Sequence, residues 1–267
     1  MRKSRAYSLI RPQPCYRAEA FLAGLRAAGY DARQGQPDWP GHAGDVLVIW
    51  NRYEETHTIA TRFERDGGRV IVAENAYLGL NRDNRQRYAM ALDAHNGRGQ
   101  WAPQGPERWR QLCIEEHLQL APMTEREGYT LIAPNRSFGM PGGVMPHTWA
   151  EQVDRELKAK GERTRIRYHP GNCKSDVPLD RDLACARRVI IWSSSVGVEA
   201  LLAGIPVECR APWWICKGWE SIGRERALER LAWAQWSVAE IEKGEPFAHL
   251  RDHLLLPTRE AKIAACN

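Results

Sequence analysis

The most informative segment of the chain runs Val189-Ile-Ile-Trp-Ser-Ser-Ser-Val-Gly-Val-Glu-Ala-Leu-Leu-Ala-Gly-Ile-Pro-Val207. An apolar run that stops at three hydroxyl residues predicts a buried strand whose carboxyl end opens onto a polar site. A short helix and a second strand are predicted to follow. The free N–H groups and the positive dipole end of that helix would face Ser193, Ser194 and Ser195, a setting that suits a phosphate or a carboxylate. The alternative is that these serines only cap the helix.

A second strand-like segment lies upstream and reads Thr164-Arg-Ile-Arg-Tyr-His-Pro170. Between it and the serine turn, residues 180–188 suit a short crossover helix. Strand, helix and strand at this spacing predict a right-handed βαβ unit with parallel strands. The loops at His169 and Ser193 would then leave the same carboxyl edge of the sheet, where open α/β sheets bind ligands. Alone, a histidine at a strand end is usually an ordinary loop residue, but its pairing with the serine turn favours a ligand site.

The first half of the chain repeats this strand–helix rhythm. Near-continuous apolar runs such as Asp45–Trp50 are typical of strands inside a parallel sheet. Three such units within about 75 residues predict a doubly wound α/β domain. The predicted elements are strands at 5–10, 45–50 and 69–74 and helices at 16–28 and 54–66.

An ordered series of motifs in the second half resembles a known family. The series is His169-Pro170, then Ser195-Val-Gly-Val-Glu199-Ala-Leu-Leu-Ala-Gly-Ile-Pro-Val207, then Pro212 and Gly218-Trp219. It resembles the nucleotide-sugar domain of the capsule-polysaccharide, Kdo-transferase-like proteins of the GT-B glycosyltransferase group. The resemblance covers roughly the C-terminal half. It implies that the His-Pro loop and the serine turn hold the nucleotide and its phosphate, and that Glu199 lies near the nucleotide ribose.

The resemblance also implies an architecture, namely an α/β fold with two doubly wound, Rossmann-like domains that face a central cleft. Residues 1–122 would form an N-terminal Rossmann-like domain on the acceptor side, and residues 123–222 the nucleotide-sugar-binding domain. Residues 223–267 would form a helical tail that packs back on the N-terminal domain. In this tail the sequence predicts one long helix at 224–242, with Trp233 and Trp236 on one face.

The whole chain also resembles a family of small proteins encoded by phages and prophages. The segments that carry this second resemblance are Arg11-Pro-Gln-Pro-Cys-Tyr-Arg-Ala-Glu-Ala-Phe21, Val48-Ile-Trp-Asn-Arg52, Val72-Ala-Glu-Asn75 and Leu231-Ala-Trp-Ala-Gln-Trp-Ser-Val-Ala-Glu-Ile241. It indicates no chemistry. It implies a protein made in the cytoplasm of an infected or lysogenic bacterial host.

Polar side chains follow the predicted strands of the first domain. If the two domains face each other, these side chains would oppose the donor residues, as a glycosyl transfer requires. On this interpretation four of them contact the acceptor, namely Arg11, Asn51, Arg52 and Asn75.

An inverting transferase needs a carboxylate or an imidazole to take the proton of the acceptor hydroxyl. Glu74 is the first candidate, because it ends a buried strand, where desolvation raises the pKa of a carboxyl group. His95, in the Gly- and Pro-rich loop at 94–106, is the second. The alternative for Glu74 is a solvated strand end or a helix cap.

Asn135 and Arg136 follow the predicted strand at Leu131 and offer a second phosphate contact, unless they form an ordinary turn with Gly139. No metal and no other cofactor is expected, because positive groups and the helix N-terminus would neutralise the leaving phosphate. The expected donor-binding set is His169, Pro170, Ser193, Ser194, Ser195, Glu199, Asn135 and Arg136.

Composition adds only weak limits. The 267 residues carry a formal net charge of +5, with 31 arginines among the 38 basic residues, which gently favours an anionic partner. A nucleic-acid partner is compatible with this charge, but no helix-turn-helix, zinc-finger or aromatic RNA-binding signature indicates one. No apolar run approaches the roughly 18 residues of a membrane span, and no secretory signal follows Met1. Seven scattered cysteines without metal-type spacing suit reduced thiols in the cytoplasm.

Together these features predict a glycosyltransferase that moves a sugar from a nucleotide-sugar donor to an acceptor hydroxyl. A hydroxymethylated base of phage DNA is one acceptor that fits a basic phage protein. A capsule or lipopolysaccharide sugar is the second. A non-catalytic nucleotide-binding module on the same fold is the alternative of a different class. The sequence indicates no oligomeric state.

Overall fold

The computed structural model describes residues 3–79, 86–173 and 175–255. The chain forms two compact units, of which the first comprises Met1–Arg108 with Glu229–Asn267 and the second comprises Trp109–Leu228. The sequence placed the domain boundaries at 122/123 and 222/223 instead. The polar segment near 121 belongs to the second unit, because the Ala121 N–H donates to the Leu202 carbonyl at 2.9 Å and Arg224 Nη1 donates to the Ala121 carbonyl at 2.7 Å.

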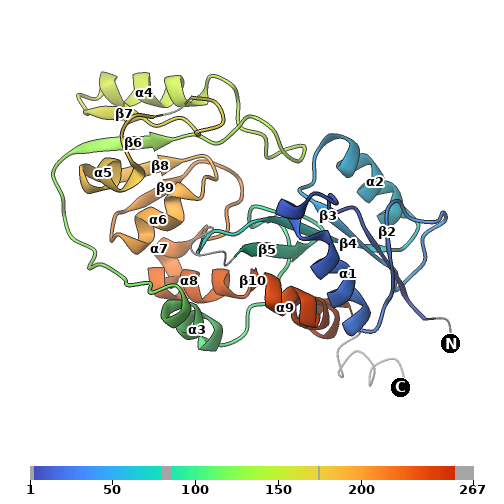
Figure 1. Ribbon diagram of the computed structural model, residues 1–267. Helices are drawn as coiled ribbons and strands as arrows, with labels where there is room; N and C mark the ends of the chain where they lie inside the picture. Colours follow the sequence, from blue (N-terminus) through green and yellow to red (C-terminus); the bar gives the residue numbers. More distant parts are fainter. Residues whose placement is uncertain (1–2, 80–85, 174, 256–267) are drawn as a thin grey trace, which may run out of the picture. The chain divides into compact units, whose positions relative to one another are not determined.

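The first unit is built on a six-stranded sheet with the strand order β10-β5-β4-β3-β1-β2 (Figure 1). The four strands from β4 to β2 are parallel, as a doubly wound domain requires, whereas β5 pairs antiparallel with β4, and β10 antiparallel with β5. The sequence did not predict β2, β5 or β10. The strands are β1 (Arg5–Ser8), β2 (Asp31–Gln34), β3 (Val46–Trp50), β4 (Arg69–Asn75), β5 (Arg87–Leu92) and β10 (Gln235–Ser237).

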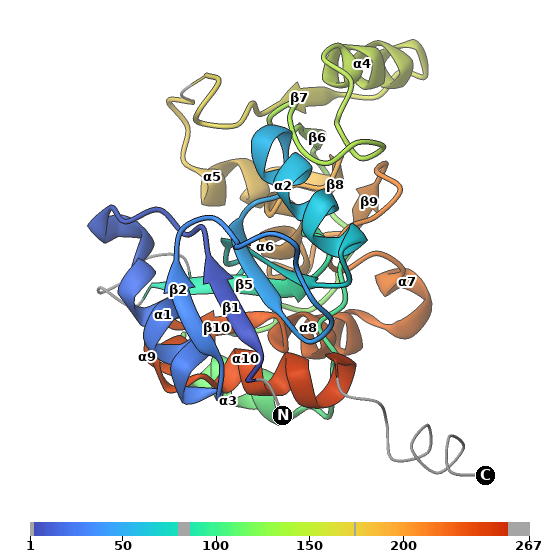
Figure 2. The same cartoon turned by 90° about the vertical axis from the view of Figure 1, so that its right-hand side faces the viewer.

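Helices cover both faces of this sheet (Figures 1 and 2). Successive side chains of β3 point to opposite faces, so they contact different helices. Val46 and Val48 face the cluster that holds α1 (Ala18–Ala27), α9 (Val238–Lys243) and α10 (Glu245–Leu250), whereas Leu47 and Ile49 face α2 (Glu54–Arg65). The backbones of α1 and α9 touch, since a Cβ atom added at Gly24 would lie 1.8 Å from the Ile241 carbonyl oxygen.

The C-terminal part of the first unit differs from the predicted single helix at 224–242. α8 (Arg224–Ala232) ends early, Trp236 lies in β10 opposite Tyr88, and α9 begins only after Ser237. The reason is a capping box: the Ser237 hydroxyl accepts from the Glu240 N–H, and the Glu240 carboxylate accepts from the Ser237 N–H at 2.7 Å. Trp233 and Trp236 therefore do not share a helix face.

The second unit contains a parallel four-stranded sheet with the order β7-β6-β8-β9 (Figure 1). Helix α4 (Trp149–Ala159) packs on the face that carries Ile132 and Ile190, and α6 (Val196–Leu202) packs against Ile191 on the other face. The strands are β6 (Tyr129–Ala133), β7 (Thr164–Ile166), β8 (Ala186–Ile191) and β9 (Val207–Cys209). The remaining elements are η1 (Pro14–Tyr16), α3 (Glu107–Glu115), α5 (Leu179–Ala184), α7 (Trp219–Ile222) and the π-helix η2 (Arg251–Leu255).

The strand order corrects one expectation about the second sheet. The segment that ends at His169 and the strand that leads to Ser193 were expected to be neighbours, yet β6 lies between β7 and β8. As a consequence, the loop after β6, with Asn135 and Arg136, emerges between the other two loops at the carboxyl edge. Among helices in the described part of the chain, none combines the length and the apolar character of a membrane-spanning segment.

Candidate functional site

Two polar side chains tie the carboxyl ends of β6 and β8 together. Ala133 pairs with Ile191 in the sheet, so Asn135 and Ser193 lie opposite each other two residues further on. The Asn135 Nδ2 donates to Ser193 Oγ at 2.9 Å, and the Ser193 N–H donates to Asn135 Oδ1 at 3.2 Å. Ser193 is buried. These two residues fix the geometry of the edge, so Ser193 is an anchor of the turn and not a helix cap.

The other two serines differ in their roles. Ser194 Oγ accepts from the Val196 N–H at 3.3 Å, while Ser195 occupies the N-cap position of α6 in a helical conformation and its side chain caps nothing. The next N–H groups already bond to the carbonyls of this turn. Within the described residues, the backbone N–H groups of Ser194 and Ser195 donate to no acceptor. The N–H groups open to an anion are thus those of the turn, and not those of the first helical turn, which the sequence analysis expected to be free.

His169 lies on the same edge, and its ring nitrogen Nε2 can donate a hydrogen bond to a ligand. Its Nδ1 accepts from the Gly171 N–H at 2.9 Å, which places the imidazole proton on Nε2 when the ring is neutral. Partial burial, and then the charge of Arg136, lower the pKa of His169 below its ordinary value of 6.5. His169 is therefore neutral at pH 7 and offers an Nε2–H donor, beside the exposed Pro170.

Arg136 supplies the positive charge of this edge. A Cβ atom added at Gly171 would lie 3.5 Å from Arg136 Nε, so the guanidinium group sits beside the His169 loop. It also stacks over the Phe138 ring, 4.5 Å from the ring centroid. Arg136 is exposed and forms no salt bridge with a carboxylate of the described residues. Phosphate groups bind such an unneutralised guanidinium well.

Glu199 is half-buried on α6, one turn after Ser195, and its N–H donates to the Ser195 carbonyl at 3.3 Å. Its predicted contact with a ribose stays a prediction.

One acidic motif in this unit escaped the sequence analysis. Asp180-Arg-Asp182 is an Asp-x-Asp sequence on α5, a pattern able to hold a divalent metal. Asp182 is buried and salt-bridged to Arg165 Nε at 2.7 Å and to Arg167 Nη1 at 2.6 Å, so its charge is already neutralised. Across the described residues, no group of three or more His, Cys, Asp or Glu side chains is arranged to hold a metal ion.

Glu74 is the chemically distinctive residue of the first unit. It lies near the carboxyl end of β4 on the face of α2, half-buried, and its Oε1 accepts from the Asn96 N–H at 2.9 Å and from Tyr77 Oη at 2.8 Å. Burial raises the pKa of Glu74 to about 7, although both hydrogen bonds oppose the shift. Its Oε2 makes no hydrogen bond with the described residues. At neutral pH this carboxyl group can both release and accept a proton.

Tyr77 and Asn96 were missed in the sequence. Tyr77 Oη also lies 2.9 Å from Asn96 Oδ1, so three side chains form one hydrogen-bonded cluster. The signal available was the spacing of three between Glu74 and Tyr77, but Asn96 reaches the cluster through a turn in which its own φ is +55°.

His95, the second candidate base, precedes Asn96 in this turn. Burial, reinforced by the charges of Arg52 and Arg98, lowers the pKa of His95 to about 4. Its Nδ1 is buried without a partner among the described residues. A neutral imidazole with so low a pKa is a weak base, and the geometry favours Glu74.

Arg52 is not a surface contact for an acceptor, contrary to the expectation. It is 4% exposed, and it forms two bonds with the Glu64 carboxylate of α2, at 2.5 and 2.6 Å, and one with the Asp93 carbonyl, at 2.6 Å. Such a paired, buried guanidinium is a structural element. It holds the loop that delivers His95 and Asn96.

The other acceptor-side residues lie at the carboxyl ends of β1, β3 and β4. Asn51 adopts φ = +53°, with its N–H bonded to the Ala73 carbonyl at 2.8 Å. Asn75 is exposed, and so is Arg11, whose guanidinium lies 5.7 Å from the Tyr16 ring centroid. Their contacts with an acceptor stay a prediction.

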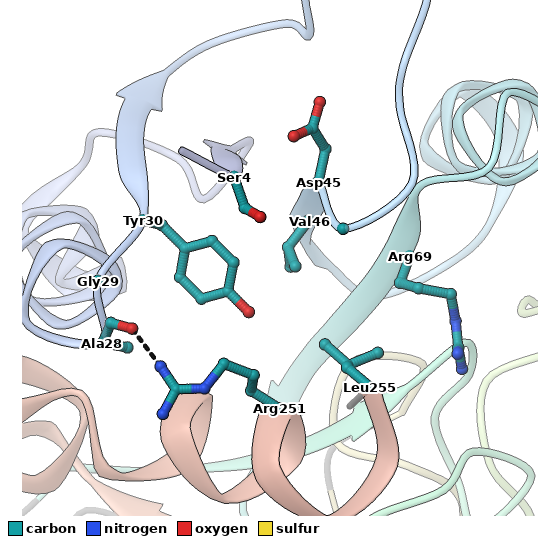
Figure 3. Close-up of a pocket in the computed structure, with 10 residues that line it drawn as sticks. Ser4, Ala28, Gly29, Tyr30, Asp45, Val46, Arg69, Arg251 and Leu255 are labelled. Carbon is teal, nitrogen blue, oxygen red and sulfur yellow. Dashed lines mark hydrogen bonds between the residues drawn. The ribbon is translucent and has the colours of Figure 1, made fainter. Parts of the chain in front are cut away.

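A cavity of about 260 Å³ opens at the opposite, amino edge of the first sheet (Figure 3). Tyr30 points into it, and the Arg251 side chain crosses its floor to bond with the Ala28 carbonyl. Burial raises the pKa of Tyr30. None of the predicted site residues lines this cavity, which is bounded by Ser4, Ala28, Gly29, Tyr30, Gly44, Asp45, Val46, Arg69, Arg251 and Leu255.

Two solved structures with a similar fold are named as transferases. The chain is similar to "Thermosulfurimonas dismutans KpsC, beta Kdo 2,7 transferase", with a TM-score of 0.54 and 13% identity over 93% of this chain and 99% of that one. It is similar to "Thermosulfurimonas dismutans KpsC, beta Kdo 2,4 transferase", with a TM-score of 0.55 and 15% identity over 87% of this chain and 91% of that one. No protein-family model and no curated protein matches the chain. At such identities the likeness shows the fold, and it confirms the predicted α/β fold with GT-B-like, Rossmann-type units.

Proposed function

We propose that this protein is a glycosyltransferase that uses a nucleotide-activated sugar as its donor. The observation that carries the proposal is the carboxyl edge of the second sheet, where Asn135, Arg136, His169 and the serine turn come from three neighbouring strand ends. In open α/β sheets this edge is where ligands bind. The likeness to two Kdo transferases supports the same reaction class.

The donor phosphate would lie between Arg136 and the serine turn. The Arg136 guanidinium group, the His169 Nε2–H and the N–H groups of Ser194 and Ser195 would stabilise the charge that develops on the phosphate as it leaves. Glu199 would accept a hydrogen bond from the ribose. In this proposal these positive and N–H groups take the place of a metal, and the absence of a metal requirement stays a prediction.

The acceptor hydroxyl would be activated by Glu74. As the bond between the anomeric carbon and the phosphate oxygen breaks, the acceptor oxygen bonds to that carbon and its proton passes to the Glu74 carboxylate. A base works best when its pKa is near the working pH, and the pKa of Glu74 is about 7. Asn51, Asn75 and Arg11 would orient the acceptor.

Two classes of acceptor fit the proposed chemistry. A saccharide hydroxyl is one candidate, because both similar structures are named as Kdo transferases. A hydroxymethylated base of phage DNA is the alternative, which comes from the sequence and its net charge of +5. Both present a hydroxyl group to the same base.

The test begins with the donor. Thermal-shift measurements with UDP-, CMP-, GDP- and ADP-sugars should identify one nucleotide that raises the melting temperature, since a ligand that binds only the native state stabilises it. Turnover is then measured with saccharide acceptors and with hydroxymethylated DNA. Binding without turnover on any acceptor would favour a non-catalytic nucleotide-binding module, and no binding of any nucleotide would overturn the proposal.

A further inference from the structure

The loop that carries His169 is held by a side chain that the proposed chemistry does not use. Arg167 is the first residue after β7, two positions before His169, and it is 12% exposed. Its Nη1 lies 2.6 Å from Asp182 Oδ2, 2.6 Å from the Val177 carbonyl and 3.3 Å from Ser175 Oγ. One guanidinium group thus joins the start of the loop, its far end and helix α5.

The other end of this contact is equally well defined. Asp182 is buried on α5, where Arg165 neutralises its second oxygen at 2.7 Å and the Tyr129 hydroxyl adds a bond at 3.2 Å. The Arg167 N–H donates to the Ile132 carbonyl of β6 at 2.8 Å. Arg167 is therefore fixed to the sheet by its backbone and to the helix by its side chain, in the geometry of a charge-assisted hydrogen bond.

The contacts inside the loop are weak by comparison. The N–H groups of Asn172 and Cys173 both bond to the His169 carbonyl, at 2.8 and 3.1 Å, and His169 itself is exposed. Such short-range bonds form a turn, but they do not determine where the turn lies relative to Arg136. Two side chains beside the loop make longer-range contacts. Tyr168 Oη donates to Glu151 Oε1 of α4 at 2.6 Å, and the Arg167 guanidinium group alone of the two also reaches the far end of the loop, at Val177.

We propose that Arg167, seated on Asp182, is a positioning residue that holds the His169 loop beside Arg136 and thereby sets the donor-binding geometry. The inference rests on the proposed function for one point, namely that His169 contacts the donor phosphate. The position of the imidazole can be measured without any ligand.

The pKa of His169 depends on where the imidazole lies, because it responds to burial of the ring and to the nearby charge of Arg136. Partial burial and the charge of Arg136 lower the pKa of His169 below 6.5. Release of the loop would remove the partial burial that the ring still has and would separate it from Arg136, and both changes raise its pKa. We therefore expect the pKa of His169 to rise toward 6.5 in Arg167→Gln.

The experiment is an NMR titration of the histidine Cε1–H signals in the full chain, with His169 assigned through His169→Ala. The matched control is Arg165→Gln, which removes the other salt bridge to Asp182 but contacts neither Val177 nor Ser175. Arg167→Gln should move the His169 titration and speed hydrogen exchange at Asn172 and Cys173 about tenfold, the scale for one lost charge-assisted bond. Arg165→Gln should change neither, and Arg167→Lys should restore part of both.

Three outcomes would overturn the inference: a folded Arg167→Gln with the parent titration and exchange, an equal change in Arg165→Gln, or no gain from Arg167→Lys. If Arg167→Gln does not fold, Ser175→Ala removes the longest of the Arg167 contacts instead, the one to Ser175 Oγ. An unchanged exchange rate at Asn172 and Cys173 in that variant would contradict the inference. Nucleotide affinity is measured separately in His169→Ala. An unchanged affinity would refute the proposed donor site, but it would not affect the inference that Arg167 positions the loop.

Discussion

Glu74 should oppose the stability of the protein at neutral and higher pH. The pKa of its carboxyl group is about 7 in the folded chain and 4.5 as the ordinary value, so the folded state holds its proton more tightly than the unfolded state. Stability is therefore present in full below pH 4.5 and falls as the pH rises through 7. With 1.36 kcal/mol for each pKa unit, the loss between pH 4 and pH 8 is about 3 kcal/mol.

The variant Glu74→Gln removes the titration and keeps an oxygen that can accept from Tyr77 and Asn96. We expect urea denaturation to give Glu74→Gln a free energy of unfolding about 3 kcal/mol above the parent at pH 8, and close to the parent at pH 4. Glu242→Gln, at an exposed position of α9, is the control and should follow the parent at both pH values.

The same variant should lose activity while it gains stability. General-base loss costs about 10²–10⁴-fold in turnover, whereas nucleotide affinity should stay unchanged because Glu74 belongs to the other unit from the donor residues. Parallel pH profiles for Glu74→Gln and the parent would show an ordinary carboxyl group and refute the argument from desolvation. Retained turnover on a verified acceptor would assign the base to another residue.

Three further substitutions test other parts of the structure. His169→Ala should weaken nucleotide binding by about 1–3 kcal/mol in isothermal titration calorimetry, the range for a hydrogen bond to a charged group, and an unchanged affinity would contradict the donor assignment. Glu199→Gln should weaken the binding of nucleotides but not of inorganic phosphate, since its proposed contact is the ribose; equal losses for both would contradict it. Gly24→Ala should lower the melting temperature, with a cost of about 1–3 kcal/mol, because its Cβ would lie 1.8 Å from the Ile241 oxygen and α9 must move.

The sequence predicted those elements whose burial is visible locally. Val46–Trp50 and the strand before Ser193 are continuous apolar runs because parallel strands are covered on both faces. β5 also consists of buried residues, but it begins with Arg87. It lies between β4, with which it pairs antiparallel, and β10, which comes about 150 residues later in the chain. No local pattern encodes such a partner. The break before α9 was readable, since Ser237 and Glu240 have the spacing of a capping box.

The candidate site was predictable as a set of strand ends, not as a set of contacts. Parallel strands carry their loops to one edge, so His169, Asn135 and Ser193 were expected together. Their order was not, because β6 enters between two strands that follow one another in the chain. The expectation for Glu74 came from burial alone, while the Asn96 N–H that bonds to it arrives through a loop of the antiparallel strand that the sequence did not reveal.

The arginines at the strand ends show what separates a structural guanidinium from a ligand contact. Arg52 and Arg167 each follow a strand, and each bonds both to a carboxylate on the next helix, Glu64 or Asp182, and to a loop carbonyl. Arg136 also follows a strand, but it is exposed and has no carboxylate partner among the described residues. Since a neutralised, buried guanidinium has little charge to offer a phosphate, only Arg136 of these three is available to bind one. An acidic residue on the following helix does not by itself identify a structural arginine, because α4, the helix after Arg136, also carries Glu151 and Asp154. Burial of the guanidinium group against that carboxylate makes the difference, and the sequence does not show it.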